Sequence, residues 1–391
     1  MTRRRLALLM LVVVSLTGRP GHSSERSPGE NLQGLLDDFC AQYGFPGATA
    51  AVVFANGETI SAATGFADLE ARTPMTSASR MLAASIGKTF VASTVLALAM
   101  EGELDLDGRV ADYLGDRDWF VRLPNQAAMT IAHLLQHASG LPDHVHTLGF
   151  SRAMAERVAN GDGALRPEES IAFVLDAAPL FPPGQGWAYT DTGYLLLGLI
   201  IEKVTNQSYY EEITQRFLRP LGLADTMPAN RRALPGLVVG YTPAENSFGI
   251  PARTADQAGR LLWDPATEWT GGGLVSTSRD LAEWGHQLFT GAALSKPCLA
   301  VLLKSTAVAP DTPDQRYGAG VAILENTPYG TVYGHGGWIP GYVSSLRHYA
   351  NHDVTIAFQI NTDVGIVDDS SDLVPVLEKA LAAFAIDSED E

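Results

Sequence analysis

Residues 83–90 read AASIGKTF, which places a serine, Ser85, three positions before a lysine, Lys88, among small and apolar neighbours. Only five lysines occur in the chain, so one in an apolar segment needs an explanation. Residues i and i+3 share a face of a helix, so these two side chains should meet. Burial should lower the pKa of Lys88 from its ordinary value of about 10.4 toward neutrality. A neutral lysine beside a serine can act as a general base for a nucleophile.

A helix that begins near Ser85 and continues through KTFVASTVLALAMEG would place the serine near a helix N-terminus. A backbone N–H group and the helix dipole there favour a developing oxyanion. The Ser-x-x-Lys pattern alone is weak evidence, because chance produces one in roughly a third of chains with this many serines and lysines. Other motifs must therefore accompany it.

Five further motifs follow Ser85 and Lys88 in order along the chain: HLLQHASGL (133–141), PGQGWAYTDTGYLLLG (183–198), PLGLADT (220–226), TGGGLVSTSRDLAEW (270–284) and YGHGGWIPGY (333–342). Together they resemble the serine β-lactamase and penicillin-binding-protein superfamily. The similarity is to the branch that holds class C β-lactamases, D-alanyl-D-alanine carboxypeptidases, D-aminopeptidases and related esterases. It covers residues 30 to 385, and it depends on the joint pattern because no single motif is specific.

The resemblance implies roles for individual side chains. Ser85 matches the acylated nucleophile, and Lys88 matches the lysine beside it. Tyr189 matches the tyrosine of the Y-x-N motif, a phenol that moves protons to the leaving group and from water. The third position of that motif is Asp191, and an ionised aspartate cannot donate the amide hydrogen bond expected of asparagine. Asp191 could instead cap a helix that starts near Gly193.

The motif near the C-terminal end is implied to line the edge of the sheet. His335, Gly336 and Gly337 match its K-T-G or H-x-G form. The resemblance then implies that the backbone N–H groups of Ser85 and Trp338 hold the oxyanion.

The same motif bears on substrate choice. Relatives that bind a substrate carboxylate usually offer hydroxyl groups here, whereas Gly336 and Trp338 have none. Short esters, or peptides that present an amine, should therefore react better than penicillins or D-Ala-D-Ala peptides. Arg347, on the next predicted strand, could supply the missing cation.

Strand-like sequence occurs near both ends of the chain, including a hairpin signal at Asn56-Gly57, and helical sequence fills the middle. The predicted class is α+β, and the resemblance implies an antiparallel five-stranded sheet flanked by helices, with an all-helical domain inserted. The predicted parts are an export signal (1–24), a discontinuous sheet domain (25–100 and 261–386), a helical domain (101–260) and an acidic tail (387–391).

Two competing interpretations are weaker. AASIG is close to the G-x-S-x-G elbow of α/β-hydrolases, but the HGG-type loop of that fold precedes the nucleophile, whereas here HGGW follows it. His133 and His137 lie one helical turn apart, with His144 and His146 nearby, which resembles metal-ligand spacing. No glutamate completes an H-E-x-x-H motif, and HLLQHASGL already matches a structural stretch of the family, so a metal site is not expected. The predicted enzyme uses neither a metal nor an organic cofactor.

The N-terminal sequence has a cationic head and an apolar run from Leu6 to about Leu16, which is typical of a cleaved export signal and too short for a membrane span. The net charge of −17 makes a nucleic-acid partner improbable. Cys40 lies on an apolar helical stripe, which indicates a buried thiol, although a disulfide with Cys298 remains an alternative.

These observations predict an exported serine hydrolase that acts on an ester or amide through an acyl-enzyme, of esterase, D-aminopeptidase or carboxypeptidase type. The partner is a small-molecule or peptide substrate, with no stable membrane insertion after signal cleavage. A true β-lactamase is the first alternative. A catalytically silent penicillin-binding or regulatory homologue is the second. The sequence leaves the natural substrate and the oligomeric state open.

Overall fold

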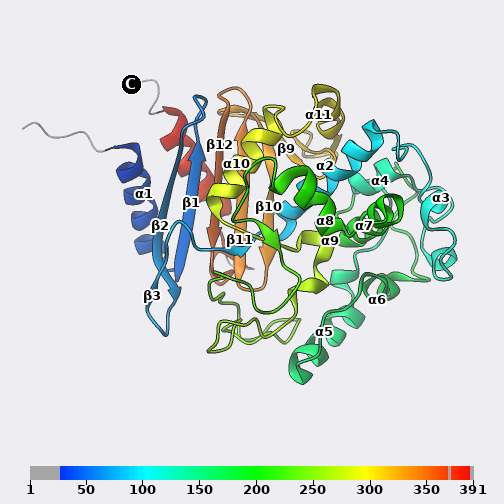
Figure 1. Ribbon diagram of the computed structural model, residues 1–391, viewed down its shortest axis with the longest axis horizontal. Coiled ribbons are helices and arrows are strands. Elements are labelled where there is room, and N and C mark those ends of the chain that lie inside the picture. The colour runs from blue at the N-terminus through cyan, green and yellow to red at the C-terminus, as the bar shows by residue number, and fades with distance from the viewer. Residues whose placement is uncertain (1–26, 369–370, 388–391) are drawn as a thin grey trace, which may run out of the picture.

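The computed structural model describes residues 27–368 and 371–387, which form a sheet-based half and a helical half side by side (Figure 1). The predicted export signal and residues 388–391 of the predicted acidic tail lie outside the described residues. Within the described part of the chain, no helix is both long enough and apolar enough to cross a membrane.

The main sheet has nine strands in the order β3-β2-β1-β12-β11-β10-β9-β8-β7, and every pairing in it is antiparallel. The prediction of an antiparallel sheet is confirmed, but five strands is wrong, because short strands extend the sheet at both edges. The bounds are β1 (Gly47–Val53), β2 (Thr59–Asp68), β3 (Thr73–Pro74), β7 (Thr306–Ala307), β8 (Gln315–Tyr317), β9 (Ala322–Thr327), β10 (Gly330–Ile339), β11 (Tyr342–Tyr349) and β12 (Val354–Ile360).

The sheet is assembled from both ends of the chain, as the sequence predicts. The Asn56-Gly57 turn joins β1 to β2, and β1 then pairs with β12, so that Ala48 lies opposite Ile360. Two small sheets complete the strands: β4 (Met81–Leu82), β6 (Leu274–Ser276) and β5 (Met227–Pro228) in one, and β13 (Val367–Asp368) with β14 (Ser371–Asp372) in the other.

Helices cover both faces of the main sheet, which is why all seven residues of β1 are buried. Ala50 and Val52 pack in one apolar cluster with residues of α1 (Pro28–Tyr43) and α12 (Val374–Ala382). Ala51 and Val53, which alternate with them, pack in a second cluster with residues of α10 (Ser278–Phe289). The alternation follows from the two-residue period of a strand.

The other half of the molecule is largely helical. Its centre is α7 (Asp191–Thr205), which contacts α2, α4, α6 and α9. The remaining helices are α2 (Gly87–Met100), α3 (Val110–Leu114), α4 (Ile131–Leu135), α5 (Leu148–Asn160), α6 (Pro167–Ile171), α8 (Tyr209–Ile213), α9 (Trp269–Gly272) and α11 (Lys296–Leu302).

Helix α2 is buried on nearly every side, as its apolar sequence predicts. Its buried hydroxyl groups are satisfied within the helix, because Ser93 and Thr94 donate to carbonyl groups four residues earlier. Phe90 stacks on Trp284 of α10 with ring centroids 3.9 Å apart, which ties α2 to the helix that covers the sheet.

Both cysteines are free thiols, so the Cys40–Cys298 disulfide alternative is wrong. Cys40 is half-buried against the cluster formed with α1 and α12, whereas Cys298 is buried in the cluster formed with α10. The two thiols therefore belong to different apolar clusters.

Candidate active site

Ser85 lies in a single 3₁₀ turn, η1 (Ala84–Ile86), directly before α2. Ala84 has a positive φ of 49°, a conformation that is costly for a residue with a Cβ atom. A Cβ atom added at Gly272 would lie 2.5 Å from the Ala84 carbonyl carbon, so a glycine is required where α9 packs against this turn. This packing fixes the position of Ser85.

Lys88 is fully buried, and the structure gives its ammonium group three acceptors. Lys88 Nζ lies 3.0 Å from Ser85 Oγ and 2.5 Å from the carbonyl oxygen of Gly271, and it forms an ion pair with Asp191. Three acceptors match the three protons of an ammonium group.

The protonation state of Lys88 corrects the sequence-based expectation. Burial by itself lowers the pKa of Lys88, but the charge of Asp191 and the neighbouring Tyr189 outweigh burial, so the pKa is raised above its ordinary value. The predicted neutral lysine is therefore wrong for the resting protein. The expectation failed because burial was considered without the carboxylate that accompanies it.

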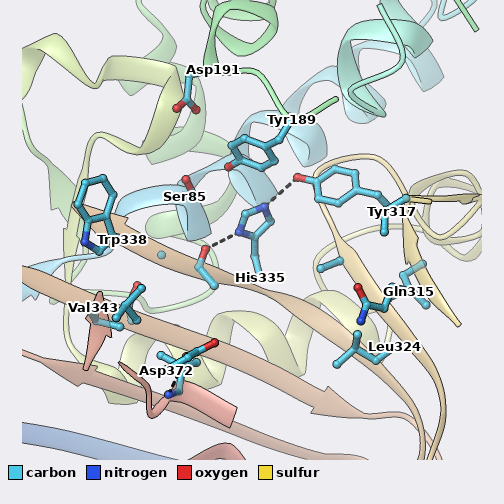
Figure 2. A pocket seen from close by; sticks show the side chains of 18 of the residues that line it. Ser85, Tyr189, Asp191, Gln315, Tyr317, Leu324, His335, Trp338, Val343 and Asp372 are labelled. Atoms are coloured by element: carbon cyan, nitrogen blue, oxygen red, sulfur yellow. Dashed lines mark hydrogen bonds between the residues drawn. The ribbon is translucent and has the colours of Figure 1, made fainter. Parts of the chain in front are cut away.

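Asp191 is the first residue of α7, where the helix dipole favours a negative charge. The N-cap position belongs to Thr190, so the interpretation of Asp191 as a helix cap is wrong. Its carboxylate points into the site instead, beside Ser85 (Figure 2). The residue that replaces the expected asparagine is thus the counter-charge of Lys88.

Tyr189 lies above the same turn, with Lys88 Nζ 4.9 Å from its ring centroid. Its hydroxyl is buried and lacks a hydrogen-bond partner among the described residues. Burial raises the pKa of Tyr189 to about 12, although the positive charge of Lys88 opposes the rise. The phenol is therefore neutral at ordinary pH and free to bond a substrate atom.

His137 holds the segment that carries Tyr189. Its carbonyl oxygen accepts the N–H of Ala188, and its Nδ1 atom accepts the N–H of Thr190. The two rings also lie 4.2 Å apart between centroids. The sequence identified His137 only as part of a structural motif or a metal site, and its positioning role depends on these tertiary contacts.

A chain of hydrogen bonds connects His137 to His335 through Tyr317 (Figure 2 shows the Tyr317–His335 bond). His137 Nδ1 accepts a hydrogen bond from the backbone N–H of Thr190, so its Nε2 atom carries the hydrogen and donates to Tyr317 Oη at 3.2 Å. Tyr317 then donates to His335 Nε2 at 2.8 Å, and His335 Nδ1 donates to the Gly336 carbonyl oxygen at 2.5 Å.

Both imidazoles in this series of hydrogen bonds are neutral. Burial, together with the nearby charge of Lys88, lowers the pKa of His335 to about 3 and that of His137 well below its ordinary value. Tyr317 was missed by the sequence analysis, since a tyrosine in a strand-like segment resembles any other core aromatic residue.

Strand β10 passes directly beside the Ser85 turn. Strand β9 pairs with β10 only as far as Gly334. Beyond Gly334, the edge of β10 that faces β9 borders the cavity. A Cβ atom at Gly337 would lie 2.2 Å from Ser344 Oγ and 2.4 Å from the Ala83 carbonyl oxygen, whereas one at Gly336 would meet only Arg347 Nη2, at 4.0 Å. Gly337 therefore permits the close approach of β10 to the nucleophile.

Trp338 is 43% exposed at the rim of the cavity, where its indole N–H donates to Asp363 at 3.1 Å. Its bulk narrows the site beside Ser85 (Figure 2). Arg347, which could have supplied a cation, is instead 3.1 Å from the carboxylate of Glu378 and donates to the Leu346 carbonyl oxygen. The missing cation is not available there.

The cavity in front of Ser85 has a volume of about 650 Å³ and is lined from both halves of the molecule. Its charged walls are biased toward acid, with Asp143, Asp191 and Asp372 against one arginine, Arg316, which lies 3.6 Å from Glu325. Burial and the nearby charge of Asp191 raise the pKa of Asp143 to about 7. The cavity is thus poorly suited to an anionic substrate.

The four histidines considered as metal ligands have other partners or positions. His133 accepts the N–H of Thr130, His144 bonds Thr192, and His146 is largely exposed. Among the described residues, no group of three or more His, Cys, Asp or Glu side chains is arranged to hold a metal ion. The antiparallel sheet also rules out the α/β-hydrolase fold, which needs a mainly parallel one.

Comparisons with known proteins agree with this architecture. The Beta-lactamase family matches residues 32–381. Penicillin-binding protein 4* of Bacillus subtilis is 29% identical over 76% of this chain, and the match spans 64% of that protein, slightly less than two thirds of its length. Esterase EstB of Burkholderia gladioli is 32% identical over half of each chain.

Among solved structures, the D-stereospecific amidohydrolase from a Streptomyces species superposes with a TM-score of 0.75 at 26% identity, covering 92% of this chain and 99% of that one. The fold, the order of the motifs and the family match over most of the sequence lead to one conclusion. The chain belongs to the Beta-lactamase family.

Proposed function

We propose that this protein is a serine hydrolase that acts on esters or amides through an acyl-enzyme on Ser85. The observation that carries the proposal is the Ser85 hydroxyl, which lines a cavity of about 650 Å³ and lies 3.0 Å from Lys88 Nζ. A nucleophile within hydrogen-bond reach of a group that can exchange protons is the essential feature of covalent catalysis.

The resting proton distribution constrains the mechanism. Lys88 holds three protons, so it must release one before it can accept the proton of Ser85. Asp191, its ion-pair partner, is positioned to take that proton, which leaves the total charge of the pair unchanged. Lys88 then takes the Ser85 proton as Oγ bonds to the substrate carbonyl carbon.

Tyr189 completes the proposed cycle on the leaving-group side. Its neutral hydroxyl, which has no hydrogen-bond partner within the described part of the chain, protonates the departing oxygen or nitrogen and regains a proton through Lys88. The backbone N–H groups of Ser85 and Trp338 hold the oxyanion in this proposal. Water then hydrolyses the acyl-enzyme by the reverse sequence of proton transfers.

The proposed substrates are neutral or amine-bearing esters and amides. Three carboxylates and one ion-paired arginine line the cavity, and Arg347 is engaged by Glu378. Among the described residues that line the cavity, a carboxylate substrate would meet no unpaired lysine or arginine, and the acidic side chains there disfavour a second negative charge. An esterase and a D-stereospecific amidohydrolase among the similar proteins support the same direction.

A panel of covalent labelling reactions followed by intact-mass spectrometry tests the proposal. We expect a fluorophosphonate and a short-chain p-nitrophenyl ester to acylate Ser85. A penicillin and a D-Ala-D-Ala thioester should react more slowly. Faster acylation by the penicillin would support a β-lactamase instead, and no acylation by any reagent would support a silent homologue.

We further propose that the protein is exported, because residues 1–24 combine a cationic head with an apolar run. Expression in a bacterial host, fractionation and N-terminal sequencing of the mature protein test this separately. Retention of the intact N-terminus in the cytoplasm would contradict it.

A further inference from the structure

A second and smaller cavity opens beside Ser85, with a volume of about 60 Å³. Ser85, Asp191 and Trp338 line both cavities, so the smaller one is a side pocket of the site. Its other walls are largely apolar and come mainly from the helical half, with Ile339 and Pro340 at the end of β10 completing them. They include Phe150, Met154, Phe248, Ile250 and Trp263.

One carboxylate interrupts these apolar walls. Glu268 lies between the 3₁₀ turn η6 (Pro265–Thr267) and α9, two residues after Ala266 and three before Gly271, the acceptor of Lys88. It is half-buried and lines the side pocket. Across the described residues, no hydrogen bond or ion pair engages the Glu268 carboxylate.

An unpaired carboxylate in an apolar pocket is unfavourable unless a partner arrives. Burial, followed by the negative charge of Asp191, raises the pKa of Glu268 to about 7, although the positive charge of Lys88 opposes the rise. The indole N–H of Trp263, which is 2% exposed, has no hydrogen-bond partner among the described residues, and Trp263 lines the same pocket.

The chemistry of the walls identifies the kind of partner. A carboxylate accepts charge-assisted hydrogen bonds from an ammonium group, and aromatic faces attract a cation within about 6 Å. An apolar cavity of about 150 Å³ is large enough to bind benzene, so a pocket of about 60 Å³ suits a smaller group, such as an ammonium group with one or two carbon atoms.

We propose that the side pocket binds a small alkylammonium group on the acyl part of the substrate, with Glu268 as the specificity-determining carboxylate. The acyl part is favoured because its carbonyl carbon is bonded to Ser85, which lines the pocket. An α-amino group and the terminal amine of a short acyl chain share this chemistry. The proposal rests on the proposed acyl-enzyme function.

Two small ammonium ions and one neutral alcohol provide the first test. Ethylammonium, ethanol and benzylammonium are compared as competitors of p-nitrophenyl butyrate hydrolysis by the full-length protein. A charge-assisted hydrogen bond should make ethylammonium bind about 10- to 100-fold more tightly than ethanol. Benzylammonium, too large for the pocket, should be weaker than ethylammonium. Equal inhibition by ethylammonium and ethanol would overturn the proposal.

Two isosteric variants then locate the site, each measured against its own hydrolysis rate. Glu268→Gln should reduce the ratio of ethylammonium affinity to ethanol affinity by about 10-fold or more. Asp143→Asn, which removes a carboxylate from the main cavity only, is the matched control and should reduce the ratio less. An equal or greater reduction in Asp143→Asn would assign the ammonium to the main cavity and overturn the proposal.

If Glu268→Gln fails to fold, as judged by circular dichroism, Phe248→Trp narrows the same pocket and should weaken ethylammonium inhibition by a similar factor. Unchanged inhibition in that variant would contradict the proposal. D-alanyl, 3-aminopropionyl and butyryl p-nitroanilides separate the α-amino from the terminal-amino source. Hydrolysis of p-nitrophenyl butyrate without any ammonium preference would leave the proposed function intact and overturn only this inference.

Discussion

Two sets of buried titratable side chains at the active site differ in their charge. On the helical side, Lys88 and Asp191 are both charged and form an ion pair. His335 on β10 and His137, which follows α4, are neutral and are joined through Tyr317 of β8 by directed hydrogen bonds. Lys88 and His137 are equally inaccessible to solvent, yet one keeps its charge and the other does not.

The difference teaches that burial alone does not decide protonation. Desolvation penalises the charged form of both groups, but an opposite charge close by reverses the outcome for Lys88. Among the described residues, neither imidazole has a carboxylate partner, and Lys88 repels a second positive charge, so both histidines are neutral. The Lys88–Asp191 pair therefore supplies charged groups that exchange protons, whereas the two histidines and Tyr317 supply a neutral scaffold.

Removal of the nucleophile should have the largest effect on activity and should leave both the ion pair and the histidine–tyrosine hydrogen bonds in place. Ser85→Ala is expected to abolish fluorophosphonate labelling and to lower turnover of p-nitrophenyl butyrate by several orders of magnitude, about 10³-fold or more. Intact-mass spectrometry and steady-state kinetics measure the two quantities. Labelling of Ser85→Ala at the wild-type rate would mean that another residue is the nucleophile.

The ion pair can be broken in two ways that separate stability from catalysis. Lys88→Met leaves the Asp191 charge unpaired in a side chain only 17% exposed, so it should cost about 3 kcal/mol in the free energy of unfolding. The double variant Lys88→Met/Asp191→Asn should recover most of that stability while remaining inactive. Denaturant unfolding and turnover assays follow the two effects.

Lys88→Arg provides the control for charge. An arginine keeps the positive charge but does not deprotonate, so its turnover should be nearly as low as that of Lys88→Ala. Near wild-type turnover of Lys88→Arg would show that Lys88 acts only as a fixed charge and that no proton passes through it.

The close approach of β10 to the Ser85 turn can be tested through two adjacent glycines. Gly337→Ala places a Cβ atom 2.2 Å from Ser344 Oγ and should destabilise the fold by about 1–3 kcal/mol and displace β10 from Ser85. Gly336→Ala, with 4.0 Å to its nearest atom, should unfold at nearly the wild-type temperature. Equal melting temperatures for the two variants would contradict the close approach described here.

The smallest effect concerns the neutral imidazoles and pH. The pKa of His335 is about 3 in the folded protein, below the ordinary unfolded value of about 6.5, so the unfolded chain binds its proton first as the pH falls. His335 therefore favours folding above about pH 6.5 and loses this contribution progressively toward pH 3. At pH 5 the loss is about 2 kcal/mol by linkage.

His335→Gln should accordingly show a flatter dependence of melting temperature on pH between about 7 and 4 than the wild type. The raised pKa values of Asp143 and Glu268 act in the opposite direction, so the comparison between variants is the measured quantity. His348→Gln is a matched control, since burial lowers the pKa of His348 to about 4 away from the cavity. Identical pH profiles for His335→Gln and wild type would contradict a neutral His335.

Much of this molecule follows from local sequence. The spacing of Ser85 and Lys88 brings their side chains together because three residues complete nearly one helical turn. The Asn56-Gly57 turn fixes the β1–β2 hairpin for a similarly local reason. The order of the motifs was sufficient to identify the family and the antiparallel sheet, but not its number of strands, because strands of two or three residues carry little pattern.

The protonation states were decided only by tertiary structure. Lys88 is charged because Asp191 and the carbonyl group of Gly271, 183 residues away along the chain, converge on it. His335 is neutral because burial and the nearby charge of Lys88 disfavour its protonation, and its bonds to Tyr317 and the Gly336 carbonyl group fix which nitrogen carries the hydrogen. Sequence spacing determines which side chains can meet within one helix or hairpin, whereas electrostatic interactions depend on distance in space, which only the folded chain defines.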